Sequence, residues 1–179
     1  QVAEFNYLHH NQSGTPYCND DISKQLLNAA SSVGIGQTLL PVLYTYSGFG
    51  EQLPTAAQKR FIQSTEQYLT QFRKLQDQCS PLNSLGICFH SLRAVSKYQM
   101  HKVLSELPSE LPVHIHIAEQ MKEVDDCIEW SGQRPVEYLY QNFDVNKRWC
   151  LVHATHLNEN EVESIARSEA VVGICPSTE

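Results

Sequence analysis

The chain has 179 residues, of which 41% are hydrophobic, and its formal net charge is −7. This length suits about one domain, so we expect residues 1–179 to form a single unit. The acidic balance without a basic stripe argues against a nucleic-acid partner, and no apolar run is long enough to predict a membrane span. The six cysteines form no CxxC pair, which favours free thiols and a cytoplasmic location.

Strand-like and helix-like segments alternate along the chain. The expected strands cover residues 2–10, 35–46, 85–90, 111–119, 148–156 and 170–179. The expected helices cover residues 22–33, 56–77, 97–107, 123–130, 135–143 and 158–168. Asp20 or Asp21 is a candidate cap for the first helix, with Gly34 just past its end, and Thr55 for the second. Such alternation is typical of an α/β protein with a parallel sheet, either a barrel or a doubly wound sheet.

Titratable residues gather at the ends of consecutive predicted strands. His90 ends "ICFH", with Arg93 in the loop that follows. His116 and Glu119 end "PVHIHIAE", and His153 lies at the end of the strand in "RWCLVHATH". Because the carboxyl ends of parallel strands share one edge of a sheet, these side chains are predicted to form one site.

The residue types suit a hydrolytic metal centre. Neutral imidazole is a good zinc ligand, a catalytic zinc acidifies a water molecule, and a nearby carboxylate can move the proton. His116, Glu119 and His153 could fill the roles of ligand, proton carrier and second histidine. They do not complete a metal site, so a further strand must contribute ligands. His114 lies two residues earlier and is expected one layer deeper in the sheet.

Structural roles are the alternative for the same residues. A histidine in an apolar strand is often a hydrogen-bonded core residue, and Glu119 could cap the following helix. Arg93 is equally explained as a surface charge or as a fork that binds a carboxylate.

Longer stretches resemble a known family. "HIHIAEQ", followed by "LVHATH" and "GICPSTE", resembles the deaminase branch of the amidohydrolase superfamily. "HSLRAV" and "AEQMKEVDDC" narrow the resemblance, which covers essentially the whole chain, to the formimidoylglutamate deiminases of bacteria. It implies a TIM-like (β/α)8 barrel, of which about strands three to seven would be present. The family's HxH pair of strand one and aspartate of strand eight are missing, so we expect a middle fragment that is inactive alone.

The resemblance also implies residue roles. His116 matches the metal ligand, Glu119 the general acid/base, and His153 the histidine that assists the attacking water. Substrate contacts are implied for His90 and Arg93 and, more loosely, for Tyr7.

The implied reaction is hydrolysis of N-formimino-L-glutamate to N-formyl-L-glutamate and ammonia, in histidine degradation. Zinc is the preferred metal, although iron and manganese accept the same ligands. The partner is a small-molecule substrate, and a homodimer is possible. Two alternatives stay open: a guanine, cytosine-like or triazine substrate, and an inactive barrel fragment with a purely structural role.

Overall fold

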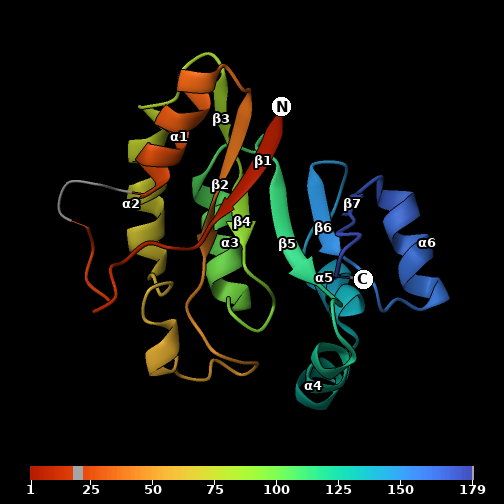
Figure 1. Ribbon diagram of the computed structural model, residues 1–179. Coiled ribbons are helices and arrows are strands. Elements are labelled where there is room, and N and C mark those ends of the chain that lie inside the picture. The colour runs from red at the N-terminus through yellow and green to blue at the C-terminus, as the bar shows by residue number, and fades with distance from the viewer. Residues whose placement is uncertain (18–21, 179) are drawn as a thin grey trace.

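The computed structural model describes residues 1–17 and 22–178, which contain a seven-stranded parallel sheet flanked by helices (Figure 1). The sheet order is β1-β2-β4-β5-β6-β7, and β3 also pairs with β2. The strands are β1 (Val2–Asn6), β2 (Gln37–Leu43), β3 (Asn83–Leu85), β4 (Ile87–Phe89), β5 (Val113–Ile117), β6 (Trp149–His153) and β7 (Val171–Gly173). The helices are α1 (Ile22–Val33), α2 (Thr65–Gln76), α3 (Lys97–Glu106), α4 (Met121–Ser131), α5 (Pro135–Asn142), α6 (Glu159–Ser168) and the short 3-10 helix η1 (Ala56–Gln58).

The sheet is strongly curled. Strands β1 and β5 are three positions apart, which would separate them by about 14 Å in a flat sheet. The ring of Phe5 in β1 nevertheless lies 5.0 Å from that of His116 in β5, centroid to centroid. The strands therefore form part of a barrel wall, and the helices lie around its outer side (Figure 1).

Alternate residues of each strand face opposite sides of this wall. In β5, Val113, Ile115 and Ile117 are fully buried and belong to the main core, which packs under the helices. His114 and His116 occupy the alternate positions and face the concave side, where Phe5 lies against both rings. The strand pattern thus directs its apolar residues outward to the helices and its histidines inward.

The expected helix over residues 56–77 is wrong, because two separate elements occupy this stretch. Thr55 is the N-cap of η1, as expected, but α2 begins only at Thr65, after Ser64. The Ser64 hydroxyl accepts a hydrogen bond from the Gln67 amide, and the Gln67 side chain accepts one from the Ser64 amide, which is a capping box. Between η1 and α2 the backbone forms hydrogen bonds with a distant segment: the Gln63 amide donates to the Tyr44 carbonyl at 2.9 Å.

Other boundaries follow local signals more closely. Gly34 follows α1 with φ of +72°, a conformation that glycine adopts without a steric penalty. The expected strand over residues 85–90 is interrupted at Gly86, which separates β3 from β4. A Cβ atom at Gly86 would lie 2.5 Å from Cδ2 of Leu40, so this position cannot carry a side chain without movement. The candidate caps Asp20 and Asp21 lie outside the described residues.

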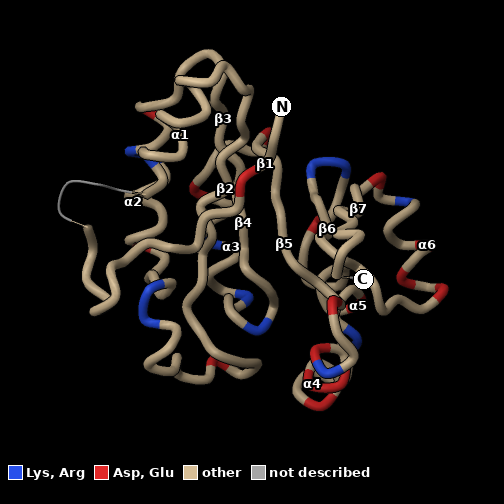
Figure 2. The backbone as a smooth tube through the Cα atoms, in the orientation of Figure 1, with Lys and Arg blue, Asp and Glu red and all other residues tan. Residues whose placement is uncertain are grey.

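Charge is unevenly distributed over the outer helices. Acidic residues gather on α4 and α6 (Figure 2). Within residues 1–17 and 22–178, no helix is both long enough and apolar enough to cross a membrane.

Candidate active site

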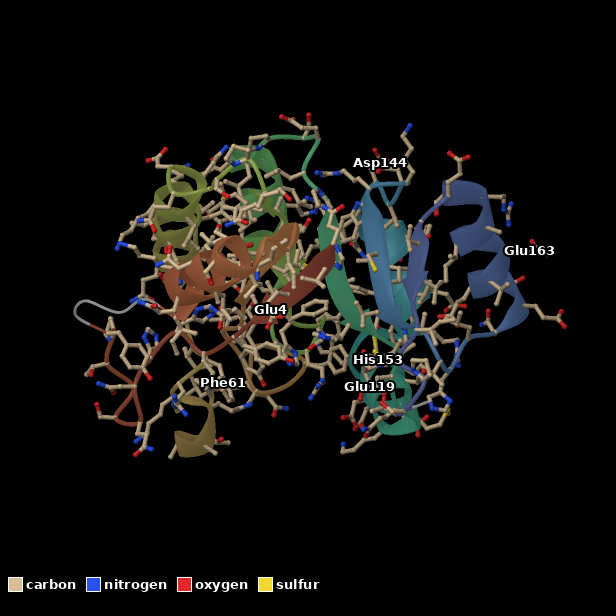
Figure 3. The ribbon with its side chains drawn as sticks, turned by 45° about the horizontal axis from the view of Figure 1, so that its top comes forward. Glu4, Phe61, Glu119, Asp144, His153 and Glu163 are labelled. Carbon is tan, nitrogen blue, oxygen red and sulfur yellow. The ribbon has the colours of Figure 1, made fainter. Side chains whose placement is uncertain are left out.

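The structure brings three of the predicted site residues together at the carboxyl ends of β5 and β6. His116 is in register with Val152, and Ile117 with His153, so the two strands end side by side. The His116 and His153 rings lie 5.7 Å apart between centroids, and Oε2 of Glu119 lies 3.8 Å from Nε2 of His153. Figure 3 shows Glu119 and His153 adjacent at this edge of the sheet.

His116 is held in one tautomer by the neighbouring strand. Its Nδ1 atom donates a hydrogen bond to the backbone carbonyl of His90 at 2.7 Å, so the proton of the neutral ring is on Nδ1. Burial lowers the pKa of His116, and the His90 carbonyl partly opposes this shift. The neutral ring therefore offers the Nε2 lone pair to a ligand, which is the form in which histidine binds metals.

The backbone at both strand ends is unusual. Ala118 has φ of +51°, His153 of +71° and Ala154 of +50°, although none of them is glycine. Left-handed conformations of such residues cost free energy and persist only where the surroundings enforce them. Here two bonds between the loops contribute: the Ala154 amide donates to the Ile117 carbonyl, and the His156 amide to the Ala118 carbonyl, both at 3.0 Å.

An aromatic wall lies beside the histidines. The ring of Tyr7 is 5.8 Å from that of His90 and 6.5 Å from that of His116. Tyr44 packs edge-on against His90 at 4.4 Å, and Phe61 lies about 6 Å from both tyrosine rings. Tyr7 and His90 are among the residues predicted from the sequence, whereas Tyr44 and Phe61 are not. A signal existed for Tyr44, which directly follows β2 at the same edge, but none for Phe61.

His90 is neutral in this environment. Burial, followed by the nearby His116 and Arg93, lowers the pKa of His90 to about 3. Its Nδ1 atom lies 3.0 Å from the Ser91 hydroxyl. The positive charge of Arg93 also lowers the pKa of His116, although less than burial does.

Arg93 is half-buried and lines a cavity of about 290 Å³, together with Tyr46, Ser96 and Trp130. Among the described residues, its buried Nε atom has no hydrogen-bond partner. An arginine that lines a cavity can bind an anionic ligand through its guanidinium group. Arg93 is therefore not a fully exposed surface charge. Carboxylate binding by Arg93 stays a prediction, because among the described residues neither Glu119 nor the site histidines line this cavity.

His114 lies one layer deeper than His116. It is in register with Cys88 on β4 and Cys150 on β6, away from the strand ends. Burial lowers the pKa of His114 to about 4, and its ring stands edge-on to Phe5 at 5.7 Å. The prediction that it lies below the site agrees with this position.

The described residues do not by themselves form a metal site. No group of three or more His, Cys, Asp or Glu side chains among them is arranged to hold a metal ion. His116 by itself fits the role of one ligand, because a backbone carbonyl fixes its Nδ1 proton and leaves Nε2 as the donor atom.

Comparisons with known proteins agree with this geometry. Formimidoylglutamate deiminase of Pseudomonas aeruginosa is 53% identical over 99% of the chain. A solved amidohydrolase from Brucella melitensis is 45% identical over 96% of the chain, with a TM-score of 0.91. The chain belongs to the amidohydrolase superfamily. No family model matches it.

The superfamily assignment confirms the expected barrel-type fold. An adenosine deaminase from Xanthomonas campestris, solved with bound zinc, is 26% identical over 92% of the chain, with a TM-score of 0.71. The chain spans about two fifths of the length of these amidohydrolases: 40% of the Pseudomonas protein and 39% of the Brucella one. The curled parallel sheet of this chain, with its outer helices, therefore corresponds to part of an amidohydrolase barrel.

Proposed function

We propose that residues 1–179 form part of a catalytic barrel that hydrolyses N-formimino-L-glutamate to N-formyl-L-glutamate and ammonia. The observation that carries this proposal is the convergence of His116, Glu119 and His153 at one sheet edge, with Arg93 nearby. The identity of 53% with the Pseudomonas deiminase supports the choice of substrate.

The proposed metal is zinc, with iron or manganese as alternatives. His116 would be one ligand through Nε2, and the others would come from barrel strands beyond these residues. When bound, the metal would make a water molecule more acidic and thus a better nucleophile.

Glu119 would carry out the proton transfers. The water adds to the formimino carbon, and Glu119 accepts the proton that the water loses. The carboxyl group passes this proton to the imino nitrogen. It then takes the second proton from the hydroxyl group of the adduct and delivers it to the same nitrogen, which leaves as ammonia as its bond to carbon breaks and the carbonyl forms. Its side chain is 37% exposed, so it can exchange protons with a bound substrate. His153, 3.8 Å away, would donate a hydrogen bond to the developing charge.

Three further residues would orient the substrate. Arg93 would bind a carboxylate of the glutamate portion, and His90 and Tyr7 would contact the rest of the substrate. Holding the carboxylate places the reacting carbon beside His116, which lowers the entropic part of the barrier.

The test is ammonia release from N-formimino-L-glutamate by the full-length gene product. We expect turnover by the wild type and a loss of about 100-fold or more in kcat for E119Q, since a carboxamide cannot accept the proton. E129Q is the matched control, because Glu129 is exposed on the neighbouring helix α4. Wild-type turnover in E119Q, or no ammonia from the zinc-loaded wild type, would refute the proposal.

A further inference from the structure

Glu123 places a buried carboxylate beneath the loop that carries Glu119. It lies in the first turn of α4 and is only 8% exposed. Its Oε1 atom accepts a hydrogen bond from the Ala118 amide at 3.1 Å, and its Oε2 atom accepts one from the Glu119 amide at 3.0 Å. Each carboxylate oxygen therefore accepts a hydrogen bond from one of two consecutive backbone amides.

These two amides do not belong to the helix. The amides that a helix leaves unsatisfied are those of its first turn, which in α4 starts at Met121. Ala118 and Glu119 precede that turn and lie in the loop between β5 and α4. The carboxylate of Glu123 thus stabilises the loop in a particular conformation, beyond any effect on the helix end.

That conformation is one the loop would not adopt by itself. Ala118 has φ of +51°, and a left-handed alanine is less stable than the right-handed form because its Cβ atom lies too close to the following carbonyl oxygen. The Ala118 carbonyl belongs to the same peptide group as the Glu119 amide, and it accepts a hydrogen bond from the His156 amide at 3.0 Å. The turn is held from both sides, and it directs Glu119 toward His153 of the next strand.

The charges around Glu123 also fit this role. Burial raises the pKa of the Glu123 carboxyl, while the two amides and Arg93 oppose that shift. Burying the Glu123 carboxylate therefore costs desolvation free energy that an exposed carboxylate would not cost.

We propose that Glu123 is a positioning residue, which holds the left-handed Ala118 turn and thereby keeps the Glu119 carboxylate beside His153. This inference rests on the proposed role of Glu119 as proton carrier. In E123Q the amide group can accept through only one atom, so one of the two loop amides loses its partner and the turn relaxes.

A double-mutant cycle in the full-length gene product tests the proposal. We expect E123Q to lower kcat about 10- to 100-fold, with KM and zinc content unchanged. In the E119Q background the same change should lower kcat less than about 2-fold, because the positioned group is already gone. An equal loss in both backgrounds, or wild-type kcat in E123Q, would overturn it. E129Q on the same helix is the control.

Two further variants keep the test independent of folding and of substrate. Glycine adopts a positive φ without penalty, so A118G should restore part of the lost kcat of E123Q. A crystal structure of E123Q should show Glu119 displaced from His153, and an unchanged separation of 3.8 Å would contradict the proposal. Because this structural measurement needs no substrate, it supports or overturns the positioning role even if formiminoglutamate is not hydrolysed.

Discussion

The salt bridge between Arg134 and Glu161 should contribute more to stability than any exposed ion pair on the same helix. Nε of Arg134 lies 2.8 Å from Oε2 of Glu161, whose side chain is 0% exposed, and the arginine also donates to the His156 carbonyl at 2.6 Å. It therefore ties α5 to α6 and to the loop that follows His153. We predict that R134A leaves a buried carboxylate without its counter-ion.

The magnitude follows from burial. Removing one partner of a buried ion pair costs about 3–5 kcal/mol. Since the Arg134 side chain is 22% exposed, water can partly replace it, and we expect the low end, about 3 kcal/mol. The Asn158 amide, which donates to the same Glu161 oxygen at 2.9 Å, remains in the variant.

Helix α6 provides a matched control. Arg167 pairs with Glu163 at 3.0 Å, but the two side chains are 74% and 67% exposed, and Figure 3 shows Glu163 pointing away from the protein. We expect R167A to cost only about 0.3–0.5 kcal/mol. Urea unfolding of the full-length gene product measures both values from the shift in midpoint at a common m value. Equal destabilisation by the two variants would refute the argument from burial.

Three further outcomes are expected. R93A should raise KM for formiminoglutamate by about 10- to 100-fold in steady-state kinetics, because a charge-assisted bond to a carboxylate is lost; an unchanged KM would favour a substrate without one, such as guanine. Burial raises the pKa of Cys127 to about 11. Alkylation of Cys127 by iodoacetamide, followed by mass spectrometry, should therefore be slow at pH 8 and faster as the pH approaches the pKa of the thiol. Rapid alkylation at pH 8 would contradict this expectation. The same shift means that the native thiol contributes stability below the ordinary thiol pKa and loses it as the pH rises through the folded value. G86A should destabilise the protein by about 1–3 kcal/mol in urea unfolding, since the new methyl group would lie 2.5 Å from Leu40 and 3.1 Å from Pro112; a neutral effect would show that the backbone moves freely there.

Local sequence patterns predicted most of the elements but not all of their limits. The prediction of one helix over residues 56–77 was wrong. Helical periodicity in the sequence continues through a segment whose backbone groups form hydrogen bonds with distant residues. The Arg60 carbonyl accepts the amides of His9 and His10, and the Ile62 carbonyl accepts Nε2 of His10 at 2.7 Å. These partners are about fifty residues away in the chain, so no local window contains them. The Ser64 capping box was a local signal for the true start of α2.

The candidate site divides in the same way. Strand-end histidines are visible in the sequence because alternation and strand length place His90, His116 and His153 at one edge of a parallel sheet. The approach of Phe61 to Tyr7 and Tyr44 depends on how the loop before α2 folds over that edge. Packing of that kind leaves no periodic trace in a sequence.

The amino-acid sequence by itself determined the order of strands and helices and the set of titratable residues at the strand ends, because both depend on short-range periodicity. Only the tertiary structure decided the curl that brings Phe5 of β1 to His116 of β5, and the pairing of Glu123 with the Ala118 and Glu119 amides. The physical reason is that sheet curvature and loop conformation are set by contacts between distant segments. Those contacts exist only once the chain has folded.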